Sequence, residues 1–167
     1  MTPLWPHIAI LGFVTAQRLV ELPIARANTN RLLASGGHEV APSHYPLIVA
    51  VHAAWLAGLW WFAPGRPISL ALLGLFAAVE LGRVWVLQTL GNRWTTRIIV
   101  VPGETLVARG PYQFTRHPNY VVVCAEIALL PLVFGLWQLA LIFTALNAAV
   151  LSIRIRAENR ALEGHRQ

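Results

Sequence analysis

The sequence predicts an all-α integral membrane protein with five transmembrane helices. Of its 167 residues, 56% are hydrophobic and only 12% are charged, whereas about a quarter of the residues in a soluble domain are charged. The apolar residues form blocks long enough to cross a bilayer, without the one-sided stripe of a soluble helix. We therefore expect a single domain over residues 1–167, with spans at residues 4–22, 45–63, 68–90, 120–134 and 137–153.

The charged residues exclude several functional classes. All 13 basic residues are arginine and all 7 acidic residues are glutamate, which gives a formal charge of +6. No basic run of the kind that binds nucleic acid is present, so we expect the arginines to set topology and to contact anionic lipid headgroups. Cys124 is the only cysteine, which excludes an intrachain disulfide and a cysteine-based zinc site. We expect no metal.

The first span carries polar groups near its end. Gln17, Arg18 and Glu21 precede Pro23, which we expect to stop the helix, and a polar loop would follow to His44. No basic segment precedes the span, so it is interpreted as retained and not as a cleaved signal. Arg18 and Glu21 could satisfy each other at i,i+3, or could face a bundle interior or a cavity.

The second and third spans differ in polarity. The second ends in an aromatic belt at Trp60, Trp61 and Phe62, as expected at a membrane interface. His52, within that span, has no partner at metal-ligand spacing, so a hydrogen-bonded structural histidine is predicted. The third span carries Glu80 and Arg83 in its second half, on the same side of the membrane as the polar turn of the first.

The last two apolar runs allow two arrangements. Residues 120–134 would make a helix of about 22 Å, shorter than the roughly 30 Å hydrocarbon core. The runs therefore form either a tilted or re-entrant hairpin or one long kinked helix. In the hairpin, ten arginines lie on one side and Arg66 alone on the other, and the positive-inside rule then places the C-terminus in the cytoplasm. The sequence thus favours the hairpin.

The loop over residues 91–119 runs into a segment rich in chemical groups. Residues 98–101 and 105–107 could be short extended pieces. Arg116 offers a fixed cation, His117 can exchange a proton near neutral pH, and Tyr112 and Tyr120 supply rings and hydroxyls. A membrane-surface loop is the alternative interpretation. The tail over residues 154–167 is either a solvated helix end or returns beside this segment.

These residues resemble the isoprenylcysteine carboxyl methyltransferase family. The resemblance rests on Leu90-Gly91, Trp94, Arg97, Pro102-Gly103, Arg109-Gly110-Pro111-Tyr112, Arg116-His117-Pro118-Asn119-Tyr120 and the tail Arg154-Ile155-Arg156-Ala157-Glu158-Asn159-Arg160-Ala161-Leu162. Within the family, the chain looks most similar to a bacterial branch that methylates alkylpyrones and alkylresorcinols. Two positions depart from the family pattern, Val121 and Asn159.

The resemblance implies an O-methyltransferase in a bacterial inner membrane that uses S-adenosylmethionine at the cytoplasmic face. Its lipophilic substrate would enter from the bilayer. The implied cofactor-binding residues are Val101, Gly103, Tyr112, Arg116, His117, Pro118, Asn119, Tyr120 and Glu158. Glu158 would close the pocket and act with Arg154 or Arg156, one of which would lie near the reacting oxygen.

Two other functional classes remain open from the residues alone. Membrane sterol reductases share an Arg-His-x-Asn-Tyr type of segment and bind NADPH, although they generally have more spans. A non-catalytic membrane scaffold would leave the ionisable clusters without a role. The residues do not distinguish a prenylcysteine carboxylate, an alkylpyrone enol and a resorcinol phenol as methyl acceptors.

Overall fold

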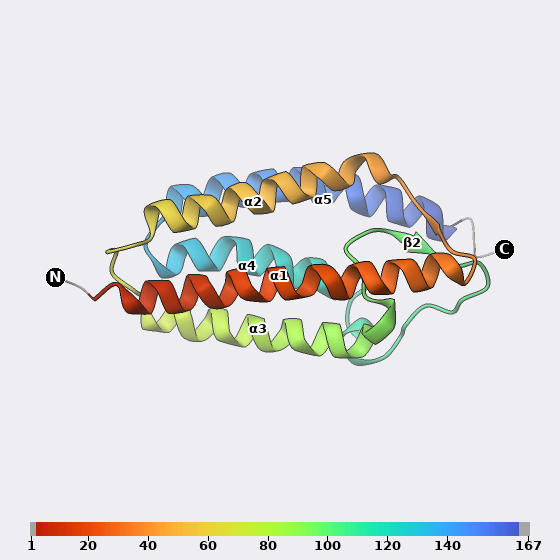
Figure 1. The fold of residues 1–167 in the computed structure, drawn as a ribbon, viewed down its shortest axis with the longest axis horizontal. Helices are drawn as coiled ribbons and strands as arrows, with labels where there is room; N and C mark the ends of the chain where they lie inside the picture. Colours follow the sequence, from red (N-terminus) through yellow and green to blue (C-terminus); the bar gives the residue numbers. More distant parts are fainter. Residues whose placement is uncertain (1–2, 164–167) are drawn as a thin grey trace.

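Five helices lie roughly along one long axis in the computed structural model, which describes residues 3–163 (Figure 1). They are α1 (Trp5–Ala34), α2 (Tyr45–Phe62), α3 (Leu70–Leu90), α4 (Pro118–Val133) and α5 (Trp137–Glu163). Four of them are long and apolar enough to cross a membrane, and α4 is a shorter apolar helix of 16 residues. An all-α membrane protein is therefore confirmed.

Helix α1 continues through Pro23, so the predicted stop at this residue is wrong. A proline inside a helix removes one backbone hydrogen bond, but here tertiary contacts hold the following turns in place. Asn28 is buried, and its Nδ2 donates to the carbonyl of Trp94 at 2.8 Å and to that of Gly91 at 3.3 Å. The expected polar loop is thus helical as far as Ala34.

A two-stranded ribbon joins the connection after α1 to the long loop. Strand β1 (His38–Glu39) pairs antiparallel with β2 (Ile99–Val100). Arg97 then binds both carboxylate oxygens of Glu39 at 2.8 Å. The extended segment expected near residues 98–101 is therefore present as β2, whereas residues 105–107 are not in a strand.

Helices α4 and α5 are separate helices that pack against each other. The turn between them closes at Gly135, whose φ of +69° favours glycine. Helix α4 also packs against α3, and α2 packs against α5. Helix α5 continues to Glu163, beyond the expected end of the span at residue 153.

The hydrophobic core occupies one end of the bundle. It comes from the first halves of α1 and α3 and the second halves of α2 and α4, and includes Leu11, Val14, Trp55, Leu59, Phe76, Ile127 and Leu130. Trp55 fixes this packing, because its Nε1 donates to the Ile127 carbonyl at 3.2 Å. The opposite end, beside the long loop, holds the polar groups described below together with a smaller set of buried apolar side chains, among them Val86, Trp94 and Val100.

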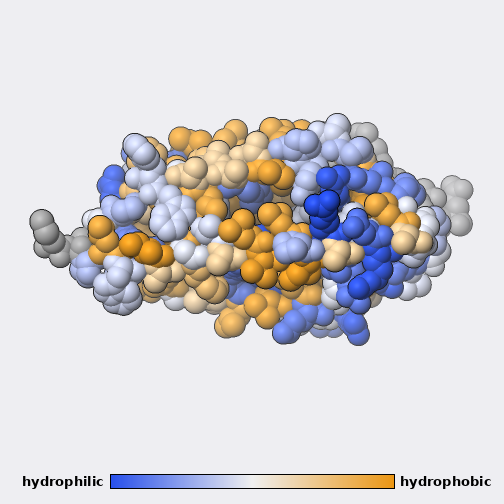
Figure 2. Space-filling view, viewed as in Figure 1, coloured by the Kyte–Doolittle hydropathy of each residue, from blue (hydrophilic) through white to orange (hydrophobic). Residues whose placement is uncertain are grey.

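The outer surface is apolar over the middle of the molecule. Figure 2 shows hydrophobic residues across the central part of one face and hydrophilic residues gathered towards the end that holds the long loop. Many large hydrophobic side chains are exposed along the helices, among them Phe13 and Leu81. Such a belt matches the surface that a bilayer covers.

Candidate functional site

A cluster of polar side chains joins the start of α4 to the last turns of α5. The Tyr120 hydroxyl donates to Glu158 Oε2 at 2.5 Å and accepts from Arg154 Nε at 2.8 Å. The ring of His117 stacks on that of Tyr120, with centroids 5.2 Å apart, and its Nδ1 lies 3.8 Å from the same Glu158 oxygen. One anion, one cation and two stacked rings thus meet at a single point.

The long loop is fastened to this cluster. Arg154 is buried, and its Nη1 donates to the carbonyl of Thr96 at 2.7 Å. The hydroxyls of Thr96 and Tyr45 lie 3.2 Å apart. The guanidinium of Arg97 lies 4.4 Å from the centre of the Tyr45 ring, within range of a cation–π contact. These contacts hold the loop over the ends of α2 and α5.

The segment before α4 packs against the end of α3. Gly110 has a φ of +58°, and a Cβ placed there would lie 2.6 Å from Thr89 Oγ1, so a larger residue would not fit without displacement. The next residues form a short helical turn, Gly110–Gln113, that carries Tyr112. Burial, and after it the charge of Glu158, raises the pKa of Tyr112 to about 12.

A cavity of about 280 Å³ lies between the helices, next to this cluster. Tyr120, Asn119 and Arg154 form its wall at one end, and Arg18, Glu21 and Arg83 border it elsewhere. Most other wall residues are apolar, among them Ile48, Val49, Leu56, Val123, Val150 and Leu151. The cavity therefore offers an apolar volume that borders the polar cluster directly.

An ion-pair network in the bundle interior joins α1, α3 and α4. Arg83 binds Glu21, with one contact of 2.6 Å, and also binds both oxygens of Glu126 at 2.9 and 3.1 Å. Arg18 reaches Glu126 at 2.5 Å and Glu21 at 3.4 Å. Two guanidinium groups and two carboxylates thus cancel formally, as buried charges must.

A second polar pair extends the network. Gln17 donates to Glu80 at 2.7 Å. The expectation that the polar groups of the first and third spans converge is met. Glu126, which completes the network, was not singled out in the sequence, although it is the one acidic residue in its apolar run.

Comparison with known proteins identifies the family. The profile described as the isoprenylcysteine carboxyl methyltransferase (ICMT) family matches residues 72–164, more than half of the chain. The chain belongs to this family. The ICMT match includes α3, the long loop, α4 and α5, and so contains the whole polar cluster around Tyr120. Family membership indicates a membrane methyltransferase.

Two curated relatives extend the similarity to nearly the full length. An uncharacterized protein of Bacillus subtilis, YpbQ, is 37% identical, and the alignment covers 95% of this chain and 96% of that protein. An uncharacterized protein of Haemophilus influenzae is 25% identical, with 89% and 90% covered. No solved structure matches this chain. The relatives therefore add bacterial members without assigning a substrate.

The structure brings together some of the residues singled out by the ICMT resemblance. His117, Tyr120, Arg154 and Glu158 contact one another, and Asn119 lines the adjoining cavity. Pro118 is buried in the first turn of α4, where a proline suits the helix start. The four contacting residues come from two segments about 35 residues apart. The tail therefore lies beside the segment that contains His117 and Tyr120, which is one of the two arrangements expected from the sequence.

Other residues singled out by the resemblance lie outside this cluster. Arg116 is exposed, Gly103 forms an exposed turn with φ of +77°, and Val101 is half-buried beside the ribbon. Arg156 is also exposed, and its guanidinium binds Ser152 of its own helix. Of these two tail arginines, Arg154 is therefore the one whose side chain reaches the cluster around Tyr120. The side chain of Asn159 lies outside the described part of the structure.

Proposed function

We propose that this ICMT-family chain is an S-adenosylmethionine-dependent O-methyltransferase acting on a lipophilic substrate that reaches the site from the bilayer. One observation carries the proposal. Tyr120 and Arg154 belong both to the charged cluster with Glu158 and to the wall of the apolar cavity. A hydrophilic methyl donor and a hydrophobic acceptor can therefore meet at these two side chains.

The chemistry of the cluster fits the cofactor. The cofactor is a zwitterionic amino acid joined to an adenosine, so it needs a carboxylate or carbonyl for its ammonium, donors for its carboxylate and aromatic surface for its base. Glu158 would supply the carboxylate for the ammonium, and the stacked rings of His117 and Tyr120 would supply the aromatic surface. Tyr112, which lies within electrostatic range of Glu158, would extend that surface.

The reaction asks little of the protein beyond positioning. When bound, the cofactor would supply a methyl group on a positively charged sulfur, and an acceptor oxygen would bond to the methyl carbon in line while the sulfur leaves as the neutral thioether S-adenosylhomocysteine. The chain's own contribution is to hold both partners in a dry site and align them. Arg154, anchored by Thr96 and Tyr120, would hold the reacting oxygen.

The proposed topology places this site at the cytoplasmic face of a bacterial inner membrane. All five helices would enter the bilayer, with α4 and α5 as a hairpin. The loop before α2, the long loop and the tail would then share the cytoplasmic side, as the arginine distribution favours. The bacterial origin of both curated relatives supports this location.

Isothermal titration calorimetry on the purified protein in detergent tests the proposal. The product S-adenosylhomocysteine is titrated in one experiment and NADPH in another. We expect heat of binding with S-adenosylhomocysteine alone. Absence of any heat with S-adenosylhomocysteine at millimolar concentration would sink the methyltransferase proposal, and saturable binding of NADPH would favour a reductase.

A further inference from the structure

Glu80, in the second half of α3, is a third carboxylate in the interior of the bundle. It is buried, with 8% of its surface exposed. The guanidinium groups of Arg18 and Arg83 are already matched in number by the carboxylates of Glu21 and Glu126. An ionised Glu80 would therefore place an uncompensated charge at membrane depth, which is energetically costly.

The contact between Glu80 and Gln17 leaves one oxygen atom of each side chain without a partner. Gln17 Nε2 donates to Glu80 Oε2 at 2.7 Å. Glu80 Oε1 and Gln17 Oε1 are both enclosed by protein, and neither has a hydrogen-bond partner in the part of the chain that the structure describes. Both atoms can only accept when the carboxyl group is ionised. The two touching side chains thus lack one donor.

We propose that Glu80 is a proton-binding site: at neutral pH its Oε1 carries a proton and donates it to Gln17 Oε1. The two side chains then close a ring of two hydrogen bonds between α1 and α3. One bound proton removes the uncompensated charge and gives both enclosed oxygens a partner, which avoids two separate costs of burial. Neither side chain belongs to the wall of the cavity, so the site goes beyond the proposed methyl transfer and does not rest on it.

The charged groups within electrostatic range of Glu80 come from three helices. They are Arg18 of α1, Arg83 of α3 and Glu126 of α4. A Glu80 without its proton would compete with Glu126 for both arginines. The bound proton therefore keeps the two arginines in the ion-pair network, and with them the part of the cavity wall that they form.

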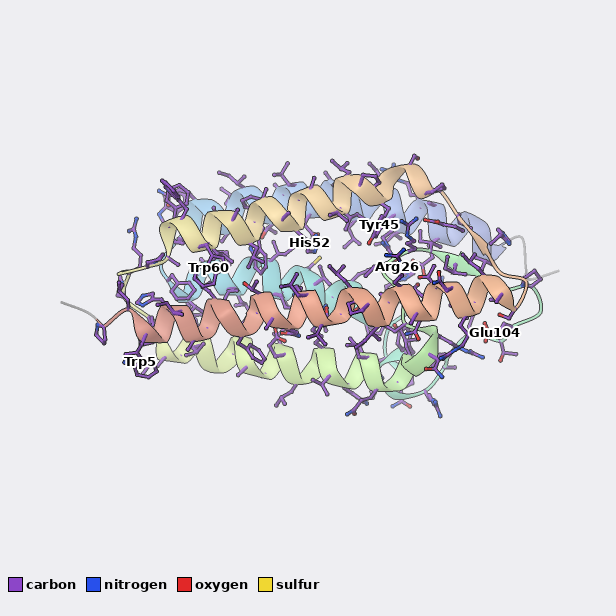
Figure 3. The ribbon with its side chains drawn as sticks, viewed as in Figure 1. Trp5, Arg26, Tyr45, His52, Trp60 and Glu104 are labelled. Atoms are coloured by element: carbon purple, nitrogen blue, oxygen red, sulfur yellow. The ribbon has the colours of Figure 1, made fainter. Side chains whose placement is uncertain are left out.

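Helix α2 turns a histidine, His52, towards the interior of the bundle (Figure 3). Its Nδ1 lies 2.9 Å from the carbonyl oxygen of Ile48, one turn earlier in the same helix, so it is the hydrogen-bonded histidine that the sequence predicts. His52 lines the cavity, whose wall does not include Glu80. Because His52 also titrates near neutral pH, His52→Gln is the control for a second titrating group in the interior.

Infrared spectroscopy of the purified protein in detergent at neutral pH tests the proton directly. The C=O stretch of a carboxylic acid is separate from the bands of a carboxylate, and we expect it in the difference spectrum between the wild type and Glu80→Gln. Carboxylate bands in its place would overturn the proposal and indicate a bound cation instead. Glu104→Gln is the control, because its exposed carboxylate pairs with Arg93 and only carboxylate bands should change. Gln17→Leu should keep the acid band but move it to higher wavenumber, because the O–H group loses its acceptor; an unmoved band would overturn the hydrogen-bonded ring.

The dependence of stability on pH gives a second, independent test, measured by denaturant titration in detergent. Glu80 in the unfolded chain would ionise at about pH 4.3. Between about pH 5 and pH 7 the folded protein would then hold one proton more than the unfolded chain, so stability falls as pH rises and this group increases the unfolding equilibrium constant about tenfold per pH unit. Glu80→Gln can close the same ring through its amide, so it should fold but lack this component, whereas His52→Gln should retain it. Parallel pH profiles for the wild type and Glu80→Gln would overturn the proposal.

Discussion

The hydroxyl of Tyr120 and the carboxylate of Glu158 form a hydrogen bond of 2.5 Å between the first turn of α4 and the charged end of α5. The bond links the start of α4 to the tail, two regions that are separated in the sequence by a long apolar stretch. The same Tyr120 hydroxyl accepts from Arg154. Removal of the Tyr120 hydroxyl would therefore take one hydrogen-bond partner from both Glu158 and Arg154.

Replacement of Glu158 tests its role towards the cofactor. If Glu158 pairs with the cofactor's ammonium or ribose hydroxyls, Glu158→Gln loses a charge-assisted hydrogen bond of about 1.5 to 3 kcal/mol, which is roughly ten- to hundredfold in affinity. Calorimetry with S-adenosylhomocysteine measures this loss. Arg156→Gln is the control, because Arg156 is exposed on the same helix. An unchanged dissociation constant for Glu158→Gln would remove Glu158 from the site.

Replacement of His117 should impair both binding and folding. Its ring stacks on Tyr120, and the residue occupies the bend that leads into α4, with φ of −133° and ψ of 58°. We expect His117→Ala to weaken S-adenosylhomocysteine binding and to lower the melting temperature. His117→Phe keeps a ring for stacking and should recover most of the stability. Equal melting temperatures for the wild type and His117→Ala would contradict a role in the bend.

The buried ion-pair network should be sensitive to the loss of one charge. Glu126 is fully buried and binds both Arg18 and Arg83, so Glu126→Gln leaves two guanidinium groups with a single carboxylate. By typical values for buried pairs, the loss is about 3 kcal/mol or more. Thermal unfolding in detergent measures it.

The surface pair of Glu104 and Arg93 is the matched comparison. Its two groups are 2.6 Å apart, but 34% and 38% of their side chains are exposed. Exposed pairs contribute at most about 1 kcal/mol, so Glu104→Gln should unfold almost as the wild type does. Similar losses for Glu126→Gln and Glu104→Gln would show that burial does not strengthen the network.

Alkaline pH should destabilise the protein through Tyr112. The side chain ionises near pH 10 in the unfolded chain, whereas its pKa in the folded protein is raised to about 12. Between these values the unfolded state holds fewer protons, so the free energy of unfolding falls as pH rises. Below about pH 10 the contribution is constant. Melting temperatures across this range should fall less steeply for Tyr112→Phe, and an identical slope would argue against the raised pKa.

The proposed topology predicts a cytoplasmic C-terminus. This arrangement places ten of the thirteen arginines on the cytoplasmic side, as the positive-inside rule favours. A C-terminal alkaline phosphatase fusion should be inactive and a fusion to a fluorescent protein should fluoresce. The same pair of reporters after Arg66 is the control and should give the reverse result. Phosphatase activity at the C-terminus would overturn the hairpin topology.

Several features of the fold could be predicted because they follow from local composition. Apolar length located α2, α3 and α5 to within a few residues at their starts, since a chain in lipid must satisfy its backbone internally. The predicted end of α1 at Pro23 was wrong because contacts distant in the sequence, and not local composition, continue the helix. The contacts that hold α1 beyond it come from Trp94 and Gly91, which lie more than 60 residues away and leave no local pattern in the sequence.

In the candidate site, too, the features that follow from local composition could be predicted and those that depend on distant contacts could not. The segment around His117 and Tyr120 was visible as a concentration of polar groups beside an apolar run. The apolar cavity beside it was not visible, because its walls come from all five helices and the long loop, which only the fold brings together. Glu126 was also missed, since a single glutamate in an apolar run acquires meaning only when Arg18 and Arg83 are seen beside it.

The unbroken length of α1 leads us to expect that the site responds to the thickness of the bilayer. Its 30 residues span about 45 Å, more than the roughly 30 Å hydrocarbon core, so the helix must tilt or protrude. The ion pairs of Arg18 and Glu21 fix α1 to the neighbouring helices inside the bundle. Nearer the C-terminal end of α1, Asn28 donates a hydrogen bond to the carbonyl of Trp94, whose side chain belongs to the wall of the cavity. We therefore expect lipids that change the tilt of α1 to shift Trp94, and with it one wall of the cavity, so that acyl-chain length alters the shape of the cavity.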